Sequence, residues 1–369
     1  MFIEIPPTGS FGVGKSIHHI VDTTRSEKYA QSDNRELILY IYYPTQEKST
    51  SSYAQDIMPI LKEKLHKSLN VKGTDLNYLN SLKEHTILNA SLSNVVEKFP
   101  ILFFSPGLED PVETYTTLLE EMASYGYVVI AINPTYAVDP TVFPDGKTIR
   151  MNSELANFWY ATHRSFEDIV DEEHEYWLQD ANFVINSIKN ISPNDSYSFL
   201  RNRLDYDLMG AFGHSFGGSL VLQLCRDRKD IKACVNLDGI AFGPKNKRLE
   251  VFNKPSMIIA ADKEVTDEEL EKHNISRSQY DQLVVPRHPR LMYNALNSDS
   301  YFVTIKNSDH NSFSDLNILK YPMTKNGDPI GIINKTRVIL LHFFNHYLKN
   351  NKFNSEIIRS LPGVIFESK

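Results

Sequence analysis

The segment Gly213-His214-Ser215-Phe216-Gly217, followed by Gly218, has the residue types and spacing of a nucleophile elbow, G-x-S-x-G. This motif places a serine on a strained turn between a strand and a helix, so that its Oγ projects clear of the backbone. Glycine on both sides avoids a Cβ clash where the neighbouring chain passes close by. The apolar LMGAF before the motif and SLVLQLC after it predict the strand and the helix. This context favours Ser215 as a nucleophile over an incidental serine in a glycine-rich turn.

A serine hydroxyl is a weak nucleophile until a base takes its proton, and behind this motif the expected chain order is serine, acid, histidine. His310 is predicted to be the base because it alone follows a late apolar strand, YFVTI at 301–305. The other histidines beyond the motif lie in a polar stretch or on the closing helix, where we expect them on or near the surface: His273, His288, His342 and His346.

Two carboxylates could be the acid that orients the histidine. Asp238 ends the apolar segment KACVNL, and Asp262 ends PSMIIAA. Both would lie at the carboxyl ends of adjacent parallel strands, where such sheets bind their ligands. The acid would fix the tautomer of His310 and stabilise the imidazolium. Spacing alone leaves both candidates open, and the unused one would be a capping or loop carboxylate.

The oxyanion that forms during acyl transfer needs two backbone N–H donors. One should come from Phe216, the residue after the nucleophile, and the other from the loop after the apolar segment PILFFS at 100–105. Pro106 has no N–H and cannot donate. Leu108 is therefore the predicted second donor.

A rival motif lies near the start of the chain. Residues 9–16, GSFGVGKS, match the phosphate-binding pattern G-x-x-x-x-G-K-[ST]. A P-loop directly follows a buried strand and opens a helix. Here Pro6-Pro7-Thr8 interrupt the preceding apolar residues, and the following SIHHIVDTT is rich in β-branched residues. These features argue against a nucleotide site that uses Lys15.

The elements that must position these residues follow from the hydrophobic pattern. Short apolar segments predict strands at 36–43, 100–105, 127–133, 232–237, 255–261 and 301–305. Helical patterns occur at 56–69, 77–92, 113–125, 175–191 and 333–348. Apolar strands that alternate with helices predict a mostly parallel central sheet with helices on both faces. We therefore expect one α/β domain over residues 1–369.

Three segments interrupt this alternation and are expected to be cap-like insertions, at about 45–97, 139–176 and 263–295. Within the second insertion, Phe158, Trp159 and Tyr160 could line a lipid pocket or belong to the core of the insertion. No internal repeat is present. The oligomeric state and the acyl-chain preference do not follow from the sequence.

Composition limits the class of protein. Hydrophobic residues make up 41% and charged residues 23% of the chain, which is typical of a globular protein. The net charge of -7 argues against nucleic-acid binding, which depends on basic surfaces. No basic segment followed by an apolar run opens the sequence, and no apolar run is long enough to span a membrane, so we expect a cytoplasmic protein. Cys225 and Cys234 lie in apolar stretches and are predicted to be buried thiols.

Taken together, these segments resemble the platelet-activating factor acetylhydrolase family of lipid esterases. The likeness covers nearly the whole chain: PPTGSFGVG and RELILYIYYPT at the start, FPILFFSPGLEDPVETYTTLLEEMASYGYVVIAIN, the run from WLQDANFVINSI to RLDYDLMGAFGHSFGGS, then VNLDG and SDHNSFSD. The likeness of the first of these segments, PPTGSFGVG, to the opening strands of the family offers a second explanation for the P-loop pattern. Where family members often carry a histidine in the oxyanion loop, this chain has Pro106.

The resemblance implies an α/β-hydrolase fold with Ser215 as nucleophile, Asp238 rather than Asp262 as acid, and His310 as base. It also implies Leu108 and Phe216 as oxyanion donors, and no metal or organic cofactor. The expected substrates are phospholipids with a short or oxidised acyl chain, as in platelet-activating factor. Two alternatives stay open at this point: a general carboxylesterase or polyester hydrolase, and a catalytically inactive member that only binds a ligand.

Overall fold

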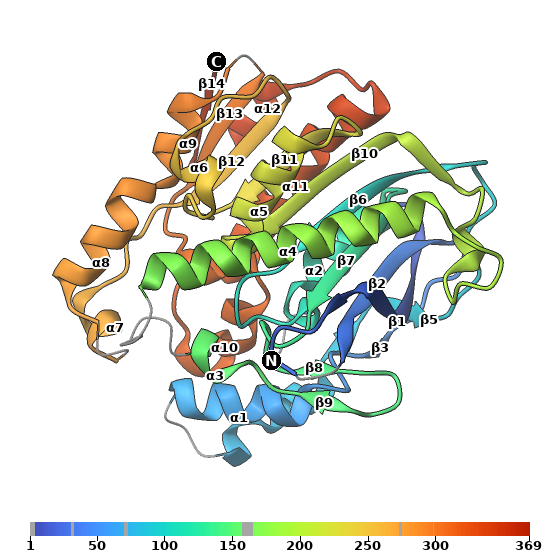
Figure 1. Ribbon diagram of the computed structural model, residues 1–369, viewed down its shortest axis with the longest axis horizontal. Coiled ribbons are helices and arrows are strands. Elements are labelled where there is room, and N and C mark those ends of the chain that lie inside the picture. The colour runs from blue at the N-terminus through green and yellow to red at the C-terminus, as the bar shows by residue number, and fades with distance from the viewer. Residues whose placement is uncertain (1–3, 31–32, 70–72, 157–164, 273–274, 298) are drawn as a thin grey trace.

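The computed structural model describes residues 4–30, 33–69, 73–156, 165–272, 275–297 and 299–369. Ten strands in these residues form one twisted sheet in the order β14-β13-β12-β11-β10-β6-β7-β2-β1-β5 (Figure 1). Their bounds are β1 Gly12–Ser26, β2 Asn34–Thr45, β5 Thr86–Leu88, β6 Phe99–Ser105, β7 Val128–Pro134, β10 Leu204–His214, β11 Ile231–Leu237, β12 Ser256–Ala261, β13 Ser300–Ile305 and β14 Val364–Ser368.

The centre of the sheet is parallel, from β7 through β6, β10, β11 and β12 to β13. Antiparallel pairs flank it, with β14 beside β13 and β2 beside β7. Every residue of β6 and β7 is buried, as expected for strands covered on both faces. The predicted mostly parallel sheet is therefore confirmed.

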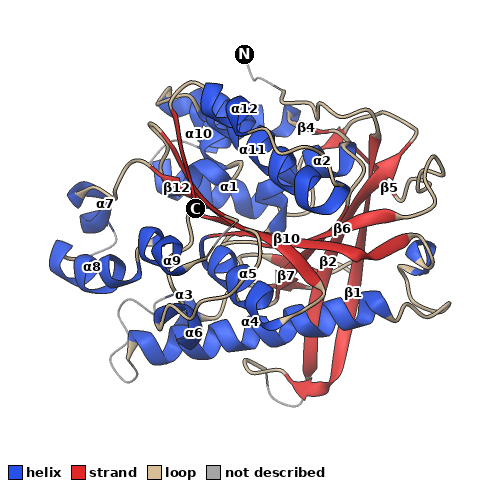
Figure 2. Cartoon of the chain, turned by 90° about the horizontal axis from the view of Figure 1, so that it is seen from above, coloured by secondary structure: helices blue, strands red, loops and turns tan. Residues whose placement is uncertain are grey.

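Helices cover both faces of the sheet (Figure 2). On one face, α4 (Phe166–Lys189) lies against α5 (Ser215–Asp227), and their apolar residues belong to one core cluster. On the other face, α2 (Thr116–Ser124) lies against α11 (Pro329–Lys349), and a second cluster fills the space between them and the sheet. The apolar stripe of each helix thus meets one face of the strands.

Part of the first insertion has a small core of its own. Helix α1 (Met58–Leu69) and the 3₁₀ helix η1 (Gly73–Ser81) bury leucines against each other and against Leu319 of α10 (Leu316–Thr324). The helix predicted at 77–92 is wrong. Leu76, Leu79 and Leu82 follow the three-residue repeat of a 3₁₀ helix, and the chain then enters β4 (Lys83–Glu84), which pairs with β3 (Ser51–Ser52), and β5, which pairs with β1.

The second insertion contains more regular structure than its sequence indicated. Strands β8 (Thr141–Val142) and β9 (Thr148–Ile149) form a small hairpin, and α3 (Ser153–Ala156) follows. Helix α4 begins nine residues before the predicted Glu175, because the hydroxyl of Ser165 caps it by accepting from the backbone N–H of Asp168. The aromatic run at 158–160, considered as a lipid pocket or core, lies outside the described residues.

The third insertion is helical, as predicted, with α7 (Asp267–Lys272), α8 (Arg277–Val284), η5 (Val285–Arg287) and α9 (Pro289–Ala295). Its last helix packs on the sheet, since Tyr293 lies against Phe302 of β13. The remaining short helices are η2 (Val112–Tyr115), η4 (Ser198–Leu200), α6 (Pro244–Lys247), η6 (His310–Phe313) and α12 (Ser355–Ser360). Among the helices described, none is both long enough and apolar enough to cross a membrane.

The candidate P-loop is part of a strand. Residues from Gly12 onward form β1, which pairs along its length with β2, and no helix follows the motif. Lys15 is buried and forms an ion pair with Glu84 of β4. A phosphate-binding lysine would instead project from a loop at a helix N-terminus, so the structure excludes a P-loop here.

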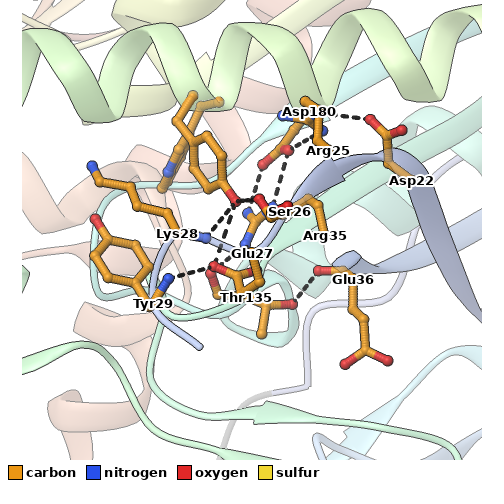
Figure 3. Close-up of polar contacts among 12 residues, drawn as sticks. Asp22, Arg25, Ser26, Glu27, Lys28, Tyr29, Arg35, Glu36, Thr135 and Asp180 are labelled. Atoms are coloured by element: carbon orange, nitrogen blue, oxygen red, sulfur yellow. Dashed lines mark hydrogen bonds and ion pairs between the residues drawn. The ribbon is translucent and has the colours of Figure 1, made fainter. Parts of the chain in front are cut away.

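A buried ion-pair network ties α4 to the start of the sheet (Figure 3). The fully buried guanidinium of Arg35 donates two hydrogen bonds to Asp180, with N···O distances of 3.1 and 2.6 Å, and one of 2.9 Å to Glu27. Arg25 donates to the same Asp180 at 2.7 Å. Such paired and hydrogen-bonded charges tolerate burial, whereas a single charge would not. The network fixes the helix whose Trp177 packs against Phe216 beside the elbow.

The two cysteines are free and buried, as predicted.

Candidate active site

Ser215 sits at the junction of β10 and α5, where the backbone turns sharply. Its φ of 54° lies in the left-handed region that side chains rarely adopt. A Cβ on Gly213 would lie 2.4 Å from the carbonyl oxygen of Gly217, and one on Gly217 would lie 2.2 Å from that of Ser105. The three chain segments therefore meet so closely that only glycine fits at both flanks, as the motif requires.

The structure brings Ser215, His310 and Asp238 into one hydrogen-bonded row. The Oγ of Ser215 lies 2.9 Å from Nε2 of His310, and Nδ1 of His310 lies 2.7 Å from Oδ2 of Asp238. The second oxygen of Asp238 accepts from the backbone N–H of Ala261 at 2.8 Å. Because the carboxylate only accepts at this separation, Nδ1 carries the proton and Nε2 faces Ser215 as a free base.

The charge of Asp238 also sets the basicity of the imidazole. Desolvation by the surrounding protein lowers the pKa of His310, but the hydrogen bond and the charge of Asp238 outweigh it, so the pKa is raised above its ordinary value of 6.5. The side chain of His310 is 44% exposed, whereas that of Asp238 is 15% exposed. The base therefore faces an open side of the site while the acid is held behind it.

Asp262 does not join this row. One of its carboxylate oxygens accepts from the backbone N–H of Asn307 at 3.0 Å, and its own N–H donates to the hydroxyl of Ser308. Asp262 is thus the loop carboxylate of the pair, and it holds the segment that leads to His310. The alternative left open by spacing is resolved geometrically in favour of Asp238.

One predicted oxyanion donor, Phe216, belongs to the elbow, and the other, Leu108, belongs to the loop after β6. The N–H of Gly217 donates to the carbonyl of Pro106 at 3.1 Å, which fastens the loop after β6 to the first turn of α5. Within the described part of the chain, the N–H of Leu108 donates to no backbone acceptor outside the regular elements. The N–H of Phe216 lies in the first turn of α5, where N–H groups have no partner within the helix. The N-terminal end of α5, which carries a partial positive charge, faces the same place. This arrangement suits a developing negative charge.

Two insertions reach the site. Lys64 of α1 donates to the backbone carbonyls of Glu109, at 3.2 Å, and of Asp139, at 2.9 Å, and so holds the oxyanion loop from outside. From α8, the half-buried Tyr280 lies near Asp238. Burial raises the pKa of the Tyr280 hydroxyl, and the negative charge of the Asp238 carboxylate raises it further. The first insertion thus anchors the loop that carries Leu108, and the third approaches the acid of the row.

Sequence reasoning missed a second polar group directly behind the elbow, made by His214, Tyr115 and the oxyanion loop. The hydroxyl of Tyr115 lies 2.8 Å from Nδ1 of His214 and 3.0 Å from the N–H of Gly107. The Nε2 of His214 lies 2.8 Å from the backbone oxygen of His310. The elbow motif accepts any residue at the position of His214, and Tyr115 reads as part of an apolar helix face, so no local signal marked either one.

We found no group of three or more His, Cys, Asp and Glu side chains placed to hold a metal ion among the residues described. The candidate chemistry at Ser215 needs only protein groups.

Comparison with known families identifies the chain. The family model described as platelet-activating factor acetylhydrolase, isoform II, matches residues 4–143 and 177–326. The chain belongs to this family. Both the elbow and the segments of Asp238 and His310 fall inside the matched residues, so the resemblance inferred from the sequence is confirmed.

Curated relatives are more distant. Cutinase est1 of Thermobifida alba is 29% identical over 158 residues, which cover 43% of this chain and 40% of the cutinase. A probable 1-alkyl-2-acetylglycerophosphocholine esterase of Arthroderma benhamiae is 29% identical over 150 residues, covering 39% of this chain and 32% of that protein. In both cases the match spans less than half of the relative's length.

A solved structure shows the fold over the full length. The ferulic acid esterase of Streptomyces cinnamoneus superposes with a TM-score of 0.72 and 21% identity, covering 99% of each chain. With the sheet order and the elbow described above, this similarity establishes the α/β-hydrolase fold.

Proposed function

We propose that the protein is a serine-dependent carboxylic ester hydrolase. The observation that carries this proposal is the continuous row from Ser215 Oγ through the imidazole of His310 to Asp238, with contacts of 2.9 and 2.7 Å. The row stands at a strained elbow with two backbone donors beside it. Nucleophile, base, acid and oxyanion site are the parts that acyl transfer requires.

In the first half of the reaction, Ser215 Oγ attacks the ester carbonyl carbon while its proton moves to Nε2 of His310. The negative charge on the carbonyl oxygen is held by the N–H groups of Leu108 and Phe216 and by the N-terminal end of α5. The imidazolium is stabilised by Asp238 at 2.7 Å. Collapse of the intermediate breaks the bond to the alcohol, which takes the proton from Nε2 as it leaves.

In the second half, a water molecule attacks the acyl group on Ser215, and His310 takes the proton of that water. The same two N–H groups hold the second oxyanion, and the proton returns to Oγ as the carboxylic acid departs. Both halves use one base on one side of the serine. Any change that misplaces His310 should therefore slow acylation and deacylation together.

The substrate class that the family favours is a phospholipid with a short or oxidised acyl chain at the scissile ester. Membership of the platelet-activating factor acetylhydrolase family and the name of the Arthroderma benhamiae relative support it.

A second candidate is a general short-chain carboxylesterase or polyester hydrolase. The match to cutinase est1 covers more of this chain than the match to the phosphocholine esterase does, 43% against 39%. The two functions share the elbow and the catalytic row and differ only in the substrate that the surrounding segments accept.

Hydrolysis of p-nitrophenyl acetate, butyrate and octanoate by wild type and Ser215→Ala tests the mechanism, and labelling with a fluorophosphonate probe counts active serines. We expect turnover and labelling for wild type and neither for the variant. Folded wild type that is inert in both assays would remove the enzyme proposal and favour a binding protein. A second comparison, of 2-acetyl and 2-palmitoyl phosphocholine lipids with a polyester film, separates the two substrate classes.

A further inference from the structure

The hydroxyl of Tyr115 lies at the centre of a buried group that links both sides of the candidate active site. Three polar groups surround it: Nδ1 of His214 at 2.8 Å, the N–H of Gly107 at 3.0 Å and Oδ2 of Asp110 at 3.3 Å. Tyr115 and His214 are both fully buried. The ring of Tyr115 is held by Phe104, with centroids 4.9 Å apart, so the hydroxyl has little freedom to move.

The direction of each hydrogen bond follows from counting protons. The backbone oxygen of His310 only accepts, so Nε2 of His214, 2.8 Å away, must carry a proton and donate it. His214 is fully buried and faces His310, which together keep it neutral, so its Nδ1 is bare. Nδ1 must then accept, and the only proton in reach is that of the Tyr115 hydroxyl.

The remaining contacts of Tyr115 are fixed by this choice. A hydroxyl has one proton, and it is given to His214, so the oxygen accepts from the N–H of Gly107. The contact to Oδ2 of Asp110 has the same hydroxyl as its donor and is longer, at 3.3 Å, so it is the weaker of the two. Every donor in the group thus meets an acceptor.

We propose that Tyr115 and His214 are positioning residues that lock the oxyanion loop and the base loop to each other across the elbow. One end of the chain of hydrogen bonds is the N–H of Gly107, next to the predicted donor Leu108. The other end is the carbonyl of His310, the residue whose side chain takes the serine proton. A shift of either end changes the distance between base, nucleophile and oxyanion, to which acyl transfer is steeply sensitive.

The link rests on the proposed ester hydrolysis, because it positions groups for that reaction and contacts no substrate itself. Without it, His310 would still have Asp238 on its Nδ1, but its backbone would lose the contact at 2.8 Å that fixes the start of η6. The loop after β6 would keep its bond from Gly217 to Pro106 and the backbone bonds of Glu109 to Ala137 and Asp139, but Gly107 would lose its acceptor. Loosening should therefore reduce kcat more than it raises KM.

The first test replaces Tyr115 with phenylalanine, which keeps the ring and removes the hydroxyl. We expect kcat for p-nitrophenyl butyrate and the rate of fluorophosphonate labelling to fall about 10- to 100-fold, with KM changed by less than about threefold. The matched control is Tyr127→Phe. It removes a hydroxyl that donates to Asn345 at 2.9 Å, away from the elbow, and should leave both rates per folded molecule unchanged.

The second test separates the two bonds of His214 and keeps the proposal testable if Tyr115→Phe folds poorly. The amide nitrogen of a glutamine reaches the position of Nε2 and retains a donor to His310, whereas an asparagine reaches only the position of Nδ1. We expect His214→Gln to retain at least about ten times the labelling rate of His214→Asn. Circular dichroism and thermal melting of each variant give the folded fraction by which the rates are divided.

The outcomes are distinct. Active wild type with an unchanged Tyr115→Phe variant, or with His214→Gln no better than His214→Asn, would overturn the positioning role while leaving ester hydrolysis intact. Loss of rate that merely follows loss of folded protein, as in the control, would also overturn it. Wild type that neither hydrolyses esters nor reacts with the probe would remove the reaction itself and this proposal with it.

Discussion

Replacing Asp238 by asparagine tests the geometry at its most sensitive point. The acid has two fixed partners: its Oδ1 accepts from the N–H of Ala261 at 2.8 Å, and its Oδ2 accepts from Nδ1 of His310 at 2.7 Å. An amide has only one oxygen. The N–H of Ala261 needs an acceptor, so the amide oxygen turns towards it and the NH₂ group faces His310.

The consequence is a change of tautomer. Because Nδ1 of His310 then faces the NH₂ group of the asparagine, it can only accept a hydrogen bond. The proton of the neutral imidazole therefore lies on Nε2, which is 2.9 Å from Ser215 Oγ. The nitrogen that should remove the serine proton is then occupied. An equivalent substitution in a serine protease triad costs about 10⁴ in kcat. We expect a loss of ~10³–10⁴ here, equal to about 4–5 kcal/mol of transition-state stabilisation.

Asp262→Asn is the matched control, because it makes the same chemical change at the end of the adjacent strand. Its carboxylate accepts from the N–H of Asn307, and an amide oxygen can still do so. We expect less than about a threefold change in kcat and a stability loss of about 1 kcal/mol or less. The assay is p-nitrophenyl butyrate hydrolysis as a function of pH, with active serines counted by fluorophosphonate labelling.

The pH profile adds an independent check. The wild-type kcat/KM should fall as the pH drops through the raised pKa of His310, above 6.5, because the protonated imidazole cannot accept the serine proton. In Asp238→Asn the two largest contributions that raise the pKa of His310, the hydrogen bond and the charge of Asp238, are gone while desolvation remains, so the acid limb of the residual activity should move to lower pH. A crippled Asp262→Asn beside a nearly normal Asp238→Asn, or two nearly normal variants, would refute the reasoning.

Four further predictions concern the frame around the site. Gly217→Ala should destabilise the fold by about 3 kcal/mol and abolish probe labelling, as measured by urea unfolding and fluorophosphonate reaction, because a Cβ there meets backbone oxygens. Asp180→Asn leaves the buried Arg35 with a single carboxylate partner, Glu27, and should lower the urea midpoint by the equivalent of about 3 kcal/mol without changing kcat per folded molecule. Lys15→Ala should likewise cost about 3 kcal/mol, by unpairing a buried carboxylate, and leave ester hydrolysis unchanged; a loss of nucleotide binding instead would restore the P-loop interpretation. Burial raises the pKa of Glu113 from 4.5 to about 7, so between these pH values the folded state keeps a proton that the unfolded state releases, and the stability of the fold falls as the pH rises. The Glu113→Gln variant should therefore be as stable as wild type below pH 4.5 and more stable by up to about 3 kcal/mol above pH 7. An equal difference in stability at both ends of this range would contradict the prediction.

The parts of the site that sequence could predict are those set by local backbone rules. Ser215 is marked by glycines two residues to either side, and His310 by its place after a short apolar strand. The structure brings both to the expected edge of the sheet. The choice between Asp238 and Asp262 needed more than spacing, since both follow strands. The left-handed backbone of Asp238, with φ of 53°, turns its side chain to His310, and that conformation has no sequence signal at an aspartate.

Elements without a strong period were harder to predict. The segment at 77–92 has only a weak helical pattern, and it forms the end of a 3₁₀ helix and two short strands. Strand β14 is only five residues long and owes its place to antiparallel pairing with β13, a contact that no local pattern reports. Tertiary pairing decides such segments because their own propensity is too small to do so.

The same distinction explains why the reaction is easier to infer than the substrate. The chemistry depends on the ends of β10, β11 and β13 and on the first turn of α5, which a parallel sheet holds at one edge whatever the side chains around them. The surroundings of that chemistry come from segments far apart in sequence, such as α1, from which Lys64 reaches the carbonyl of Glu109, and α8, which carries Tyr280. Both helices come from insertions with weak periodicity, and the link between Tyr115 and His214 joins residues 99 positions apart. Acyl-chain and head-group preference therefore follow from contacts that only the folded chain creates.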